Sequence, residues 1–258
     1  MEVKDKVIVI TGGASGIGRE MARRFTAEGA RQVVISDMNV DGLQKVADEI
    51  GAHAIPANVA VEAEVQHLIQ VAENDYGQID LLCSNAGIGV GGGPEAPNED
   101  WQRSWEVNVM SHVYAARAAI PAMVARGEGY LLNTASAAGL LTQVGSAPYA
   151  VTKHAAVSFA EWLSVTYGGR GIKVSVLCPQ AVRTAMTAGN HDGVASVDGL
   201  MEPEVLCQSV VETLAAERFL ILPHPEVLTY IQRKASDHDR WIKGMRRLQE
   251  GYGNFDWP

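Results

Sequence analysis

The sequence has 258 residues, of which 47% are hydrophobic and 20% charged, as is typical of a globular protein with a sizeable core. Its net charge of -9 argues against binding to a nucleic-acid backbone, because such proteins present a basic face. No apolar run reaches the about 18 residues needed to span a bilayer, and the N-terminus enters a strand pattern without a signal peptide. We therefore expect a cytoplasmic protein that binds neither nucleic acid nor membrane.

The cysteines and histidines do not have the spacing of a metal site. Cys83, Cys178 and Cys207 lie far apart, and the seven histidines form no ligand cluster. We therefore expect buried free thiols and no bound metal.

Short apolar runs alternate with longer helical patterns along the chain. The runs are rich in Val, Ile and Leu, as strands covered on both faces must be. They lie at 6–11, 32–36, 52–57, 79–84, 129–135, 173–178 and 218–223, and the helical stretches at 17–29, 39–50, 61–75, 98–125, 148–168 and 203–217. This alternation predicts an α/β fold of one domain over residues 1–258, a Rossmann-type doubly wound parallel sheet of about seven strands with helices on both faces.

Two segments do not follow the alternation. Residues 184–202 are rich in Gly, Ala and Asp with weak periodicity, and are predicted to form a mobile substrate loop. Residues 225–258 are predicted to form a charged helical tail, which either crosses a neighbouring subunit or caps its own.

A glycine-rich turn, TGGASGIGRE (11–20), follows the first predicted strand and opens the first helix. Gly12 permits a tight turn, and Gly16 and Gly18 let the backbone approach a diphosphate, which the helix N-terminus favours. A tight turn without a ligand is the alternative, but the strand before it and the amphipathic helix after it favour a dinucleotide site. The predicted cofactor-binding residues of this turn are Gly12, Ser15, Gly16, Ile17 and Gly18.

Asp37 ends the second predicted strand, 19 residues after Gly18. A dinucleotide fold places a carboxylate here against the ribose 2′-hydroxyl, where it repels a 2′-phosphate. The next residue is Met38 rather than Arg or Lys, so the predicted cofactor is NAD(H) and not NADP(H). The alternative is that Asp37 only caps the helix that follows.

The stretch YAVTK (149–153) places Tyr149 and Lys153 one turn apart on one helix face. Oxidation of an alcohol by a nicotinamide needs a base for the hydroxyl proton, and a free tyrosine has a pKa of about 10. A nearby cation lowers that pKa. We therefore expect Lys153 to let Tyr149 act as general base in oxidation and general acid in reduction.

Together with NAG (85–87) and Ser136, these motifs make the chain resemble the short-chain dehydrogenase/reductase family over residues 5–223. The resemblance implies further cofactor-binding residues besides Tyr149 and Lys153: Asn58, Val59, Asn85, Ala86, Gly87, Pro179, Val182 and Thr184. Asn58 stands where the family has an aspartate, and Gln180 where a glycine usually follows the proline.

The resemblance also implies a catalytic set of Asn108, Ser136, Tyr149 and Lys153. Ser136, 13 residues before Tyr149, would bind the substrate oxygen and stabilise charge that develops there. In the family, the asparagine holds a water that links the lysine to solvent, and the lysine also holds the nicotinamide ribose. Each residue alone has an ordinary structural explanation, and only the combination favours catalysis.

The predicted substrate wall is small or apolar, with Arg183 as the one nearby cation. Its residues are Ala137, Ala138, Leu140, Leu141, Gln143, Gln180, Ala181 and the loop 184–202. We therefore expect a neutral, largely apolar secondary alcohol or ketone, with the loop ordering on it. The resemblance implies a homotetramer or homodimer formed through the helices at 98–125 and 148–168.

Two other functions remain open. A non-catalytic NAD-binding module that senses redox state would need no proton-transfer groups, so the complete catalytic set argues against it. Epimerases and dehydratases of related folds also use Tyr-x-x-x-Lys, but usually carry a separate C-terminal substrate domain, which this sequence does not predict.

Overall fold

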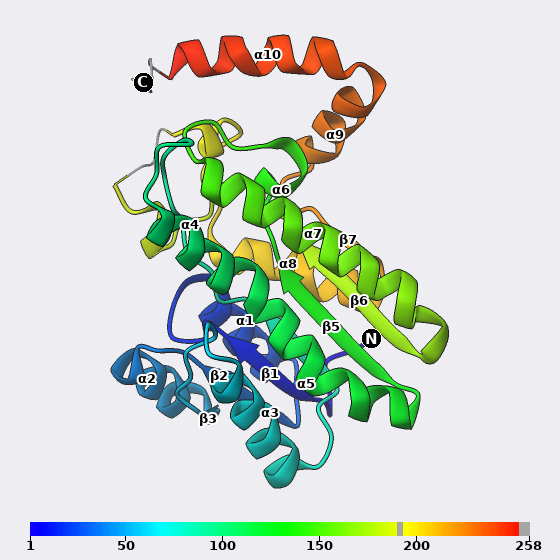
Figure 1. Ribbon diagram of the computed structural model, residues 1–258. Coiled ribbons are helices and arrows are strands. Elements are labelled where there is room, and N and C mark those ends of the chain that lie inside the picture. Colours follow the sequence, from blue (N-terminus) through cyan, green and yellow to red (C-terminus); the bar gives the residue numbers. More distant parts are fainter. Residues whose placement is uncertain (190–192, 253–258) are drawn as a thin grey trace.

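The computed structural model describes residues 1–189 and 193–252, and its centre is a parallel sheet of seven strands (Figure 1). The strands are β1 (Val7–Thr11), β2 (Gln32–Ser36), β3 (His53–Ala54), β4 (Leu81–Ser84), β5 (Gly129–Thr134), β6 (Ile172–Leu177) and β7 (Leu220–Ile221). β1, β4 and β5 are buried along their whole length, which explains their unbroken apolar sequence. The edge strands β3 and β7 are shorter than predicted, since each pairs with a single neighbouring strand.

Helices cover both faces of the sheet. One face packs against α1 (Gly16–Ala27), α2 (Val40–Ile50) and α8 (Pro203–Ala215). The other packs against α3 (Glu62–Tyr76), α5 (Ser111–Arg126) and α7 (Ala147–Tyr167). The three layers confirm the predicted α/β fold class, a Rossmann-type doubly wound sheet.

The strand order β3-β2-β1-β4-β5-β6-β7 reverses direction at the centre of the sheet. The chain moves outward from β1 to β3 on one side and returns to start β4 on the other side of β1. In such sheets, ligands bind outside the carboxyl ends of the strands where the order reverses. The loops after β1 and β4 are therefore the place to look for a site.

The helix predicted over 98–125 is interrupted. α4 (Asn98–Trp105) and α5 are joined by a π-helix, Glu106–Met110. A π-helical turn holds one more residue than an α-helical turn and is frequent at functional sites. Here it contains Asn108, which is fully buried.

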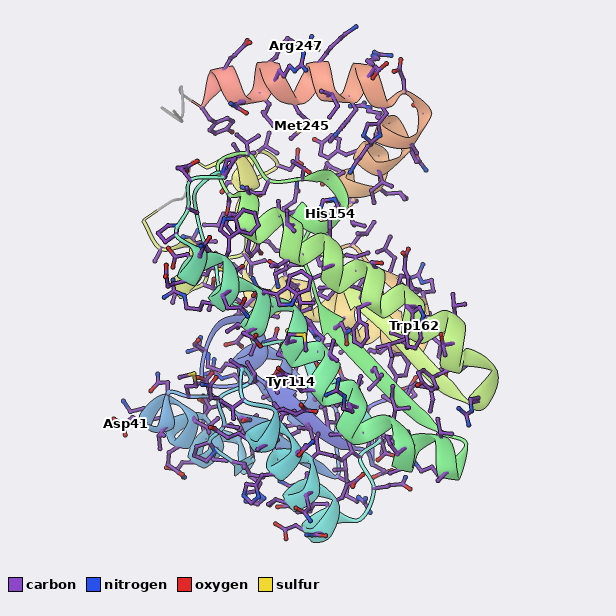
Figure 2. All side chains as sticks on the ribbon, viewed as in Figure 1. Asp41, Tyr114, His154, Trp162, Met245 and Arg247 are labelled. Carbon is purple, nitrogen blue, oxygen red and sulfur yellow. The ribbon has the colours of Figure 1, made fainter. Side chains whose placement is uncertain are left out.

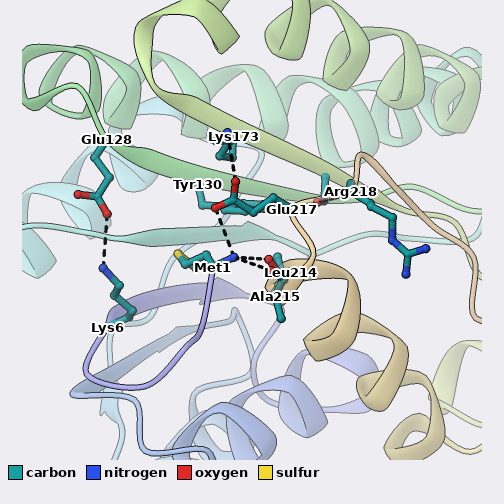
Figure 3. Close-up of polar contacts among 10 residues, drawn as sticks. Met1, Lys6, Glu128, Tyr130, Lys173, Leu214, Ala215, Glu217 and Arg218 are labelled. Atoms are coloured by element: carbon teal, nitrogen blue, oxygen red, sulfur yellow. Dashed lines mark hydrogen bonds and ion pairs between the residues drawn. The ribbon is translucent and has the colours of Figure 1, made fainter.

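The amino ends of the strands carry a set of ion pairs and hydrogen bonds (Figure 3). Lys6, before β1, pairs with Glu128, before β5, at 3.4 Å, and Lys173 of β6 pairs with Glu217 at 3.1 Å. The amino group of Met1 also contacts Glu217, at 3.5 Å. Exposed pairs of this kind each contribute at most about 1 kcal/mol. These ion pairs lie at the opposite end of the sheet from the carboxyl ends of the strands, where a ligand is expected.

The C-terminal region forms two helices, α9 (Glu226–Ser236) and α10 (His238–Gly251), in agreement with the predicted helical tail. α9 packs against α6 (Ala138–Leu141), a short helix that was not predicted from the sequence. Lys234 Nζ of α9 donates to the Leu140 carbonyl of α6 at 2.7 Å. α10 runs across one end of the molecule and has no fully buried residue (Figure 1). The rest of the tail, 253–258, lies outside the described residues.

The predicted substrate loop contains two short 3₁₀-helices, Ala185–Thr187 and Val194–Ser196, and its residues 190–192 lie outside the described part of the chain. All three cysteines are free and buried, as predicted. Within residues 1–189 and 193–252, no helix is long and apolar enough to cross a membrane.

Candidate active site

A cavity of about 1710 Å³ opens at the carboxyl edge of the sheet. It runs from the glycine turn after β1, past the ends of β4, β5 and β6, to the C-terminal helices. Pockets of about 300–1000 Å³ suffice for a drug-sized ligand, so this one has room for a dinucleotide and a second molecule.

The glycine turn has a shape that only glycine permits. Gly12 and Gly16 have φ of 71° and 53°, in the left-handed region. A Cβ on Gly18 would lie 2.1 Å from the Gly12 carbonyl oxygen, so any side chain there would push α1 away from β1. Gly12, Ser15, Gly16 and Ile17 line the cavity, whereas Gly18 lies behind the turn. The turn thus fits a diphosphate at the N-terminus of α1.

Asp37 lies in the cavity wall next to this turn. Its carboxylate accepts from the Ala14 N–H at 3.2 Å and from the Asn39 N–H at 3.0 Å. The cap of α2 is Asn39, whose side chain accepts from the Gly42 N–H. Asp37 therefore does not cap that helix, and its carboxylate supports the glycine turn at the predicted ribose position.

The predicted adenine-side residues Asn58 and Val59 also line the cavity. The side-chain oxygen of Asn58 accepts from the Ala60 N–H at 3.0 Å, and the backbone N–H of Asn58 donates to the Glu64 carboxylate at 2.7 Å. These bonds fix the loop after β3 and leave the side-chain NH₂ of Asn58 without a protein acceptor among the described residues.

Asn85 joins the ends of three strands. Its side chain donates to the Thr11 carbonyl at 3.1 Å and accepts from the Thr134 hydroxyl at 3.1 Å. Together with Ala86 and Gly87 it lines the cavity. The loop after β4 is thus held against β1 and β5, where the predicted cofactor would lie.

The loop after β6 approaches the glycine turn from the other side. Pro179, Val182 and Thr184 line the cavity, and the Thr184 methyl lies 3.1 Å from where a Cβ on Gly16 would be. The Thr184 N–H donates to the Thr187 hydroxyl at 3.1 Å. The contact between Thr184 and Gly16 brings two segments that are far apart in the sequence together over one end of the cavity.

Tyr149, Lys153 and Ser136 meet deeper in the cavity. Lys153 Nζ lies 5.6 Å from the centroid of the Tyr149 ring and donates to the Thr134 carbonyl at 3.2 Å. The Ser136 hydroxyl donates to the Pro179 carbonyl at 3.3 Å and accepts from the Ala138 N–H at 3.1 Å. The arrangement places a phenol, an ammonium group and a hydroxyl around one volume.

Asn108 does not line the cavity but holds its wall. Its amide accepts from the Ile88 N–H at 2.9 Å and donates to the Ile88 carbonyl at 3.0 Å. A Cβ on Gly87 would lie 3.2 Å from both Asn108 Oδ1 and Lys153 Nζ. The π-helix therefore clamps the loop after β4 beside Lys153.

Burial is the largest influence on the pKa values of Lys153 and Tyr149. It lowers the pKa of Lys153 to about 8. It also raises the pKa of Tyr149, with the neighbouring Ser136 hydroxyl acting in the opposite direction. Burial outweighs the Ser136 hydroxyl, so the pKa of Tyr149 is raised, and the lowered pKa predicted from the sequence is wrong for the cofactor-free protein. The neutral phenol is the resting form of Tyr149.

The sequence reading missed His112. It lies one turn after Asn108 on α5, is 1% exposed, and neither ring nitrogen has a hydrogen-bond partner among the described residues. Burial, and to a lesser extent the charge of Lys153, lower its pKa to about 3, so it stays neutral.

The predicted substrate wall is largely found in the cavity. Ala137, Ala138, Leu141, Gln143, Gln180 and Ala181 line it, whereas Leu140 and Arg183 do not. Arg183 points away and pairs with Glu202 at 2.7 Å. The sequence reading missed the residues of α9 and α10 that line the outer part of the cavity, because the path of the tail could not be predicted.

No group of three or more metal-ligating side chains occurs in the described segments 1–189 and 193–252. The functional groups of the cavity are instead those of a nucleotide site joined to a proton-transfer site. Comparison with known proteins gives the family.

A model of the short chain dehydrogenase family matches residues 6–194. The chain belongs to the short-chain dehydrogenase family. This confirms the predicted resemblance, and the protein is an oxidoreductase of that family. The match covers β1 to β6, and with them every predicted site residue.

Similar short-chain dehydrogenases act on different substrates. The 1-deoxy-11-beta-hydroxypentalenate dehydrogenase of Streptomyces exfoliatus is 34% identical over 247 residues, 92% of this chain and 90% of that protein. The meso-2,3-butanediol dehydrogenase of Serratia marcescens is 35% identical over 193 residues, 73% of this chain and 76% of that protein. A short chain dehydrogenase/reductase of Burkholderia phymatum, solved in complex with NAD, superimposes with a TM-score of 0.84 at 30% identity, over 93% of this chain and 96% of that one.

Proposed function

We propose that the protein interconverts a secondary alcohol and a ketone with NAD(H), acting on a molecule that is largely apolar around the reacting carbon. The observation that carries this proposal is the position of Tyr149, Lys153 and Ser136 in one cavity with the glycine turn and Asp37. Similar proteins named for the dehydrogenation of hydroxylated compounds, and a similar structure that contains NAD, support it.

The residues of the cavity fit a dinucleotide. The glycine turn would hold the diphosphate, Asp37 the adenosine ribose, and Asn58 and Val59 the adenine. Asn85, Ala86, Gly87, Pro179, Val182 and Thr184 would surround the nicotinamide half. When bound, the nicotinamide takes a hydride from the alcohol carbon or returns it to the ketone.

Tyr149 would exchange the proton. In ketone reduction its neutral phenol donates to the substrate oxygen, a role that its raised pKa favours near neutral pH. In alcohol oxidation it must first lose its proton, so oxidation should become faster as the pH rises. The Ser136 hydroxyl would hold the substrate oxygen, and the charge of Lys153 would stabilise the phenolate.

A screen of secondary alcohols and ketones, followed by NADH absorbance, tests the proposed function. We expect alicyclic or aryl secondary alcohols to be oxidised, because the apolar residues Ala137, Ala138 and Leu141 line the same cavity as Tyr149. A protein that binds NADH but turns over no member of a broad panel would instead be the redox-sensing module. Epimerisation or dehydration of the substrate without net NADH change would indicate an epimerase or a dehydratase.

The preference for NAD should depend on Asp37. We expect wild-type activity with NAD to exceed that with NADP at least about tenfold, because a carboxylate facing a 2′-phosphate costs several kcal/mol. Asp37→Asn keeps an oxygen for the Ala14 N–H but removes the charge, so it should narrow the preference mainly by improving NADP turnover. Steady-state kcat/KM with both cofactors measures this. A wild-type preference for NADP would refute the assignment.

We also propose a homodimer or homotetramer formed through α4–α5 and α7. Trp105, Trp162 and Val165 on these helices are 41%, 55% and 84% exposed, and such apolar surface favours burial against another subunit. A cytoplasmic location remains part of the proposal.

A further inference from the structure

The outer part of the cavity is formed by α9 and α10. Trp241, Met245 and Leu248 follow one face of α10, at spacings of four and three residues, and all three line the cavity. They are half-buried, and in Figure 2 Met245 points from α10 toward the body of the protein. This apolar face lines the same cavity as the catalytic residues.

Trp241 joins this face to the catalytic centre. It packs on the cluster of Ala137, Leu141 and Val227, and its ring lies 6.4 Å from that of Tyr230 on α9. Ala137 directly follows Ser136 in the chain. An apolar surface therefore leads from the substrate oxygen site outward under α10.

Three arginines, Arg233, Arg240 and Arg247, line the outer part of the cavity beside this apolar surface. Arg233 lies over the Tyr230 ring at 6.0 Å, and Arg240 directly precedes Trp241. Among the described residues, none of the three guanidinium groups forms an ion pair with a carboxylate. Other arginines of this chain do have such partners, as Arg24 and Glu28 or Arg183 and Glu202 show.

The charge of the cavity is opposite to that of the protein. The net charge is -9, yet Asp37 is the one carboxylate among the described residues that line the cavity, and it lies beside the glycine turn. The outer part thus presents cations without carboxylates. An acidic protein repels anions over most of its surface, so cations at this opening would select and orient an anionic molecule.

We propose that this outer part binds an anionic group at the far end of an otherwise apolar substrate, with Arg233 and Arg240 as its binding residues. The proposal rests on the proposed dehydrogenase function and names its substrate class. It replaces the expectation of a neutral substrate, which was based on Arg183 as the only nearby cation. Guanidinium groups suit carboxylates and phosphates, because both offer two oxygens to the planar fork.

Matched substrate pairs test the proposal. A panel of secondary alcohols, each with a carboxylate far from the carbinol, is compared with the methyl esters, and a phosphate monoester on the same scaffold distinguishes the two anions. We expect kcat/KM for the preferred anion to exceed that for the ester by about tenfold or more, as hydrogen bonds to a charged group allow. Added salt should reduce this ratio, because it screens exposed charges.

Two variants locate the effect. Arg240→Gln should lower the anion-to-ester ratio about five- to tenfold, and the double variant with Arg233→Gln should lower it further, leaving only what Arg247 supplies. Arg246→Gln is the control, because Arg246 is exposed on α10, does not line the cavity and carries the same charge. Equal use of anion and ester by wild type, or an equal loss in Arg246→Gln, would overturn the proposal.

Calorimetry of acid and ester binding to the protein–NADH complex separates this proposal from the proposed function. If no pair is turned over but the acid binds more tightly than its ester, and Arg240→Gln removes that difference, the anion site stands and the dehydrogenase assignment fails. If esters are oxidised and the acid has no advantage in binding, the dehydrogenase assignment stands and the anion site fails. Absence of binding by every acid of the panel also contradicts the anion site.

Discussion

Replacing Tyr149 by phenylalanine should lower kcat about a thousandfold while leaving NADH binding within about twofold of wild type. The change removes one oxygen, and a positioned acid or base contributes about 10²–10⁴ to the rate. The ring, which packs 5.6 Å from Lys153 Nζ, remains. Single-turnover ketone reduction, followed by NADH absorbance, and NADH titration by fluorescence measure the two quantities.

Tyr130→Phe is the matched control for this loss. Tyr130 is 1% exposed on β5, and its hydroxyl makes a 2.7 Å hydrogen bond with Ser175, away from the cavity. Its removal should cost about 1 kcal/mol of stability and leave kcat unchanged. If Tyr149→Phe keeps more than about a tenth of the wild-type rate, well above what loss of a proton donor permits, the assigned role of Tyr149 is wrong.

The sheet could be predicted because its strands are buried on both faces. Runs such as VIVIT and QVVIS have no polar face, so their extent in the sequence matches β1 and β2 closely. The edge strands were less predictable. Each has a neighbour on one side only, so fewer ladder bonds fix its ends, and β3 and β7 shrink to two residues.

The cofactor side of the site could be predicted because its glycines and its carboxylate act through the local backbone. Gly12 and Gly16 need the left-handed backbone, which is a property of the turn itself, and Asp37 ends a strand whose position the apolar run gives. Asn108 was different. Its place in a π-helix depends on tertiary packing and on bonds to Ile88, which lies 20 residues away in the sequence.

The outer half could not be predicted because it depends on one turn. Asp237, at φ -154° and ψ 93°, ends α9 and starts α10, and its carboxylate caps the new helix through the Arg240 N–H at 2.9 Å. A different turn would direct Trp241 and Arg240 elsewhere. The pattern of α10 predicts an amphipathic helix but not which surface it faces, so the arginines of the cavity were not recognised.

Replacing Lys153 by methionine should stabilise the cofactor-free protein by about 2 kcal/mol near pH 7 and remove activity. Lys153 is 3% exposed, and burial lowers its pKa from 10.5 to about 8. Keeping this buried group charged at neutral pH costs the folded state about 3 kcal/mol. Methionine fills a similar volume without that cost, and loses about 1 kcal/mol with the hydrogen bond to the Thr134 carbonyl.

The gain should disappear in alkaline solution. Between pH 8 and 10.5 the folded protein releases the Lys153 proton while the unfolded chain keeps it, so wild-type stability rises relative to the variant. Above about pH 10.5 both states are neutral and only the lost hydrogen bond remains, leaving the variant about 1 kcal/mol less stable. Urea unfolding of both proteins at pH 7 and pH 10.5 measures this reversal.

Lys173→Met separates burial from charge removal. Lys173 is half exposed on β6 and pairs with Glu217 at 3.1 Å, so its loss should cost at most about 1 kcal/mol at pH 7. A Lys153→Met protein that is less stable than wild type at pH 7 would contradict the lowered pKa. If the gain is found, the protein holds a charge beside Tyr149 at a cost to its own stability. That is the relation expected of a group kept for its action on another molecule rather than for the fold.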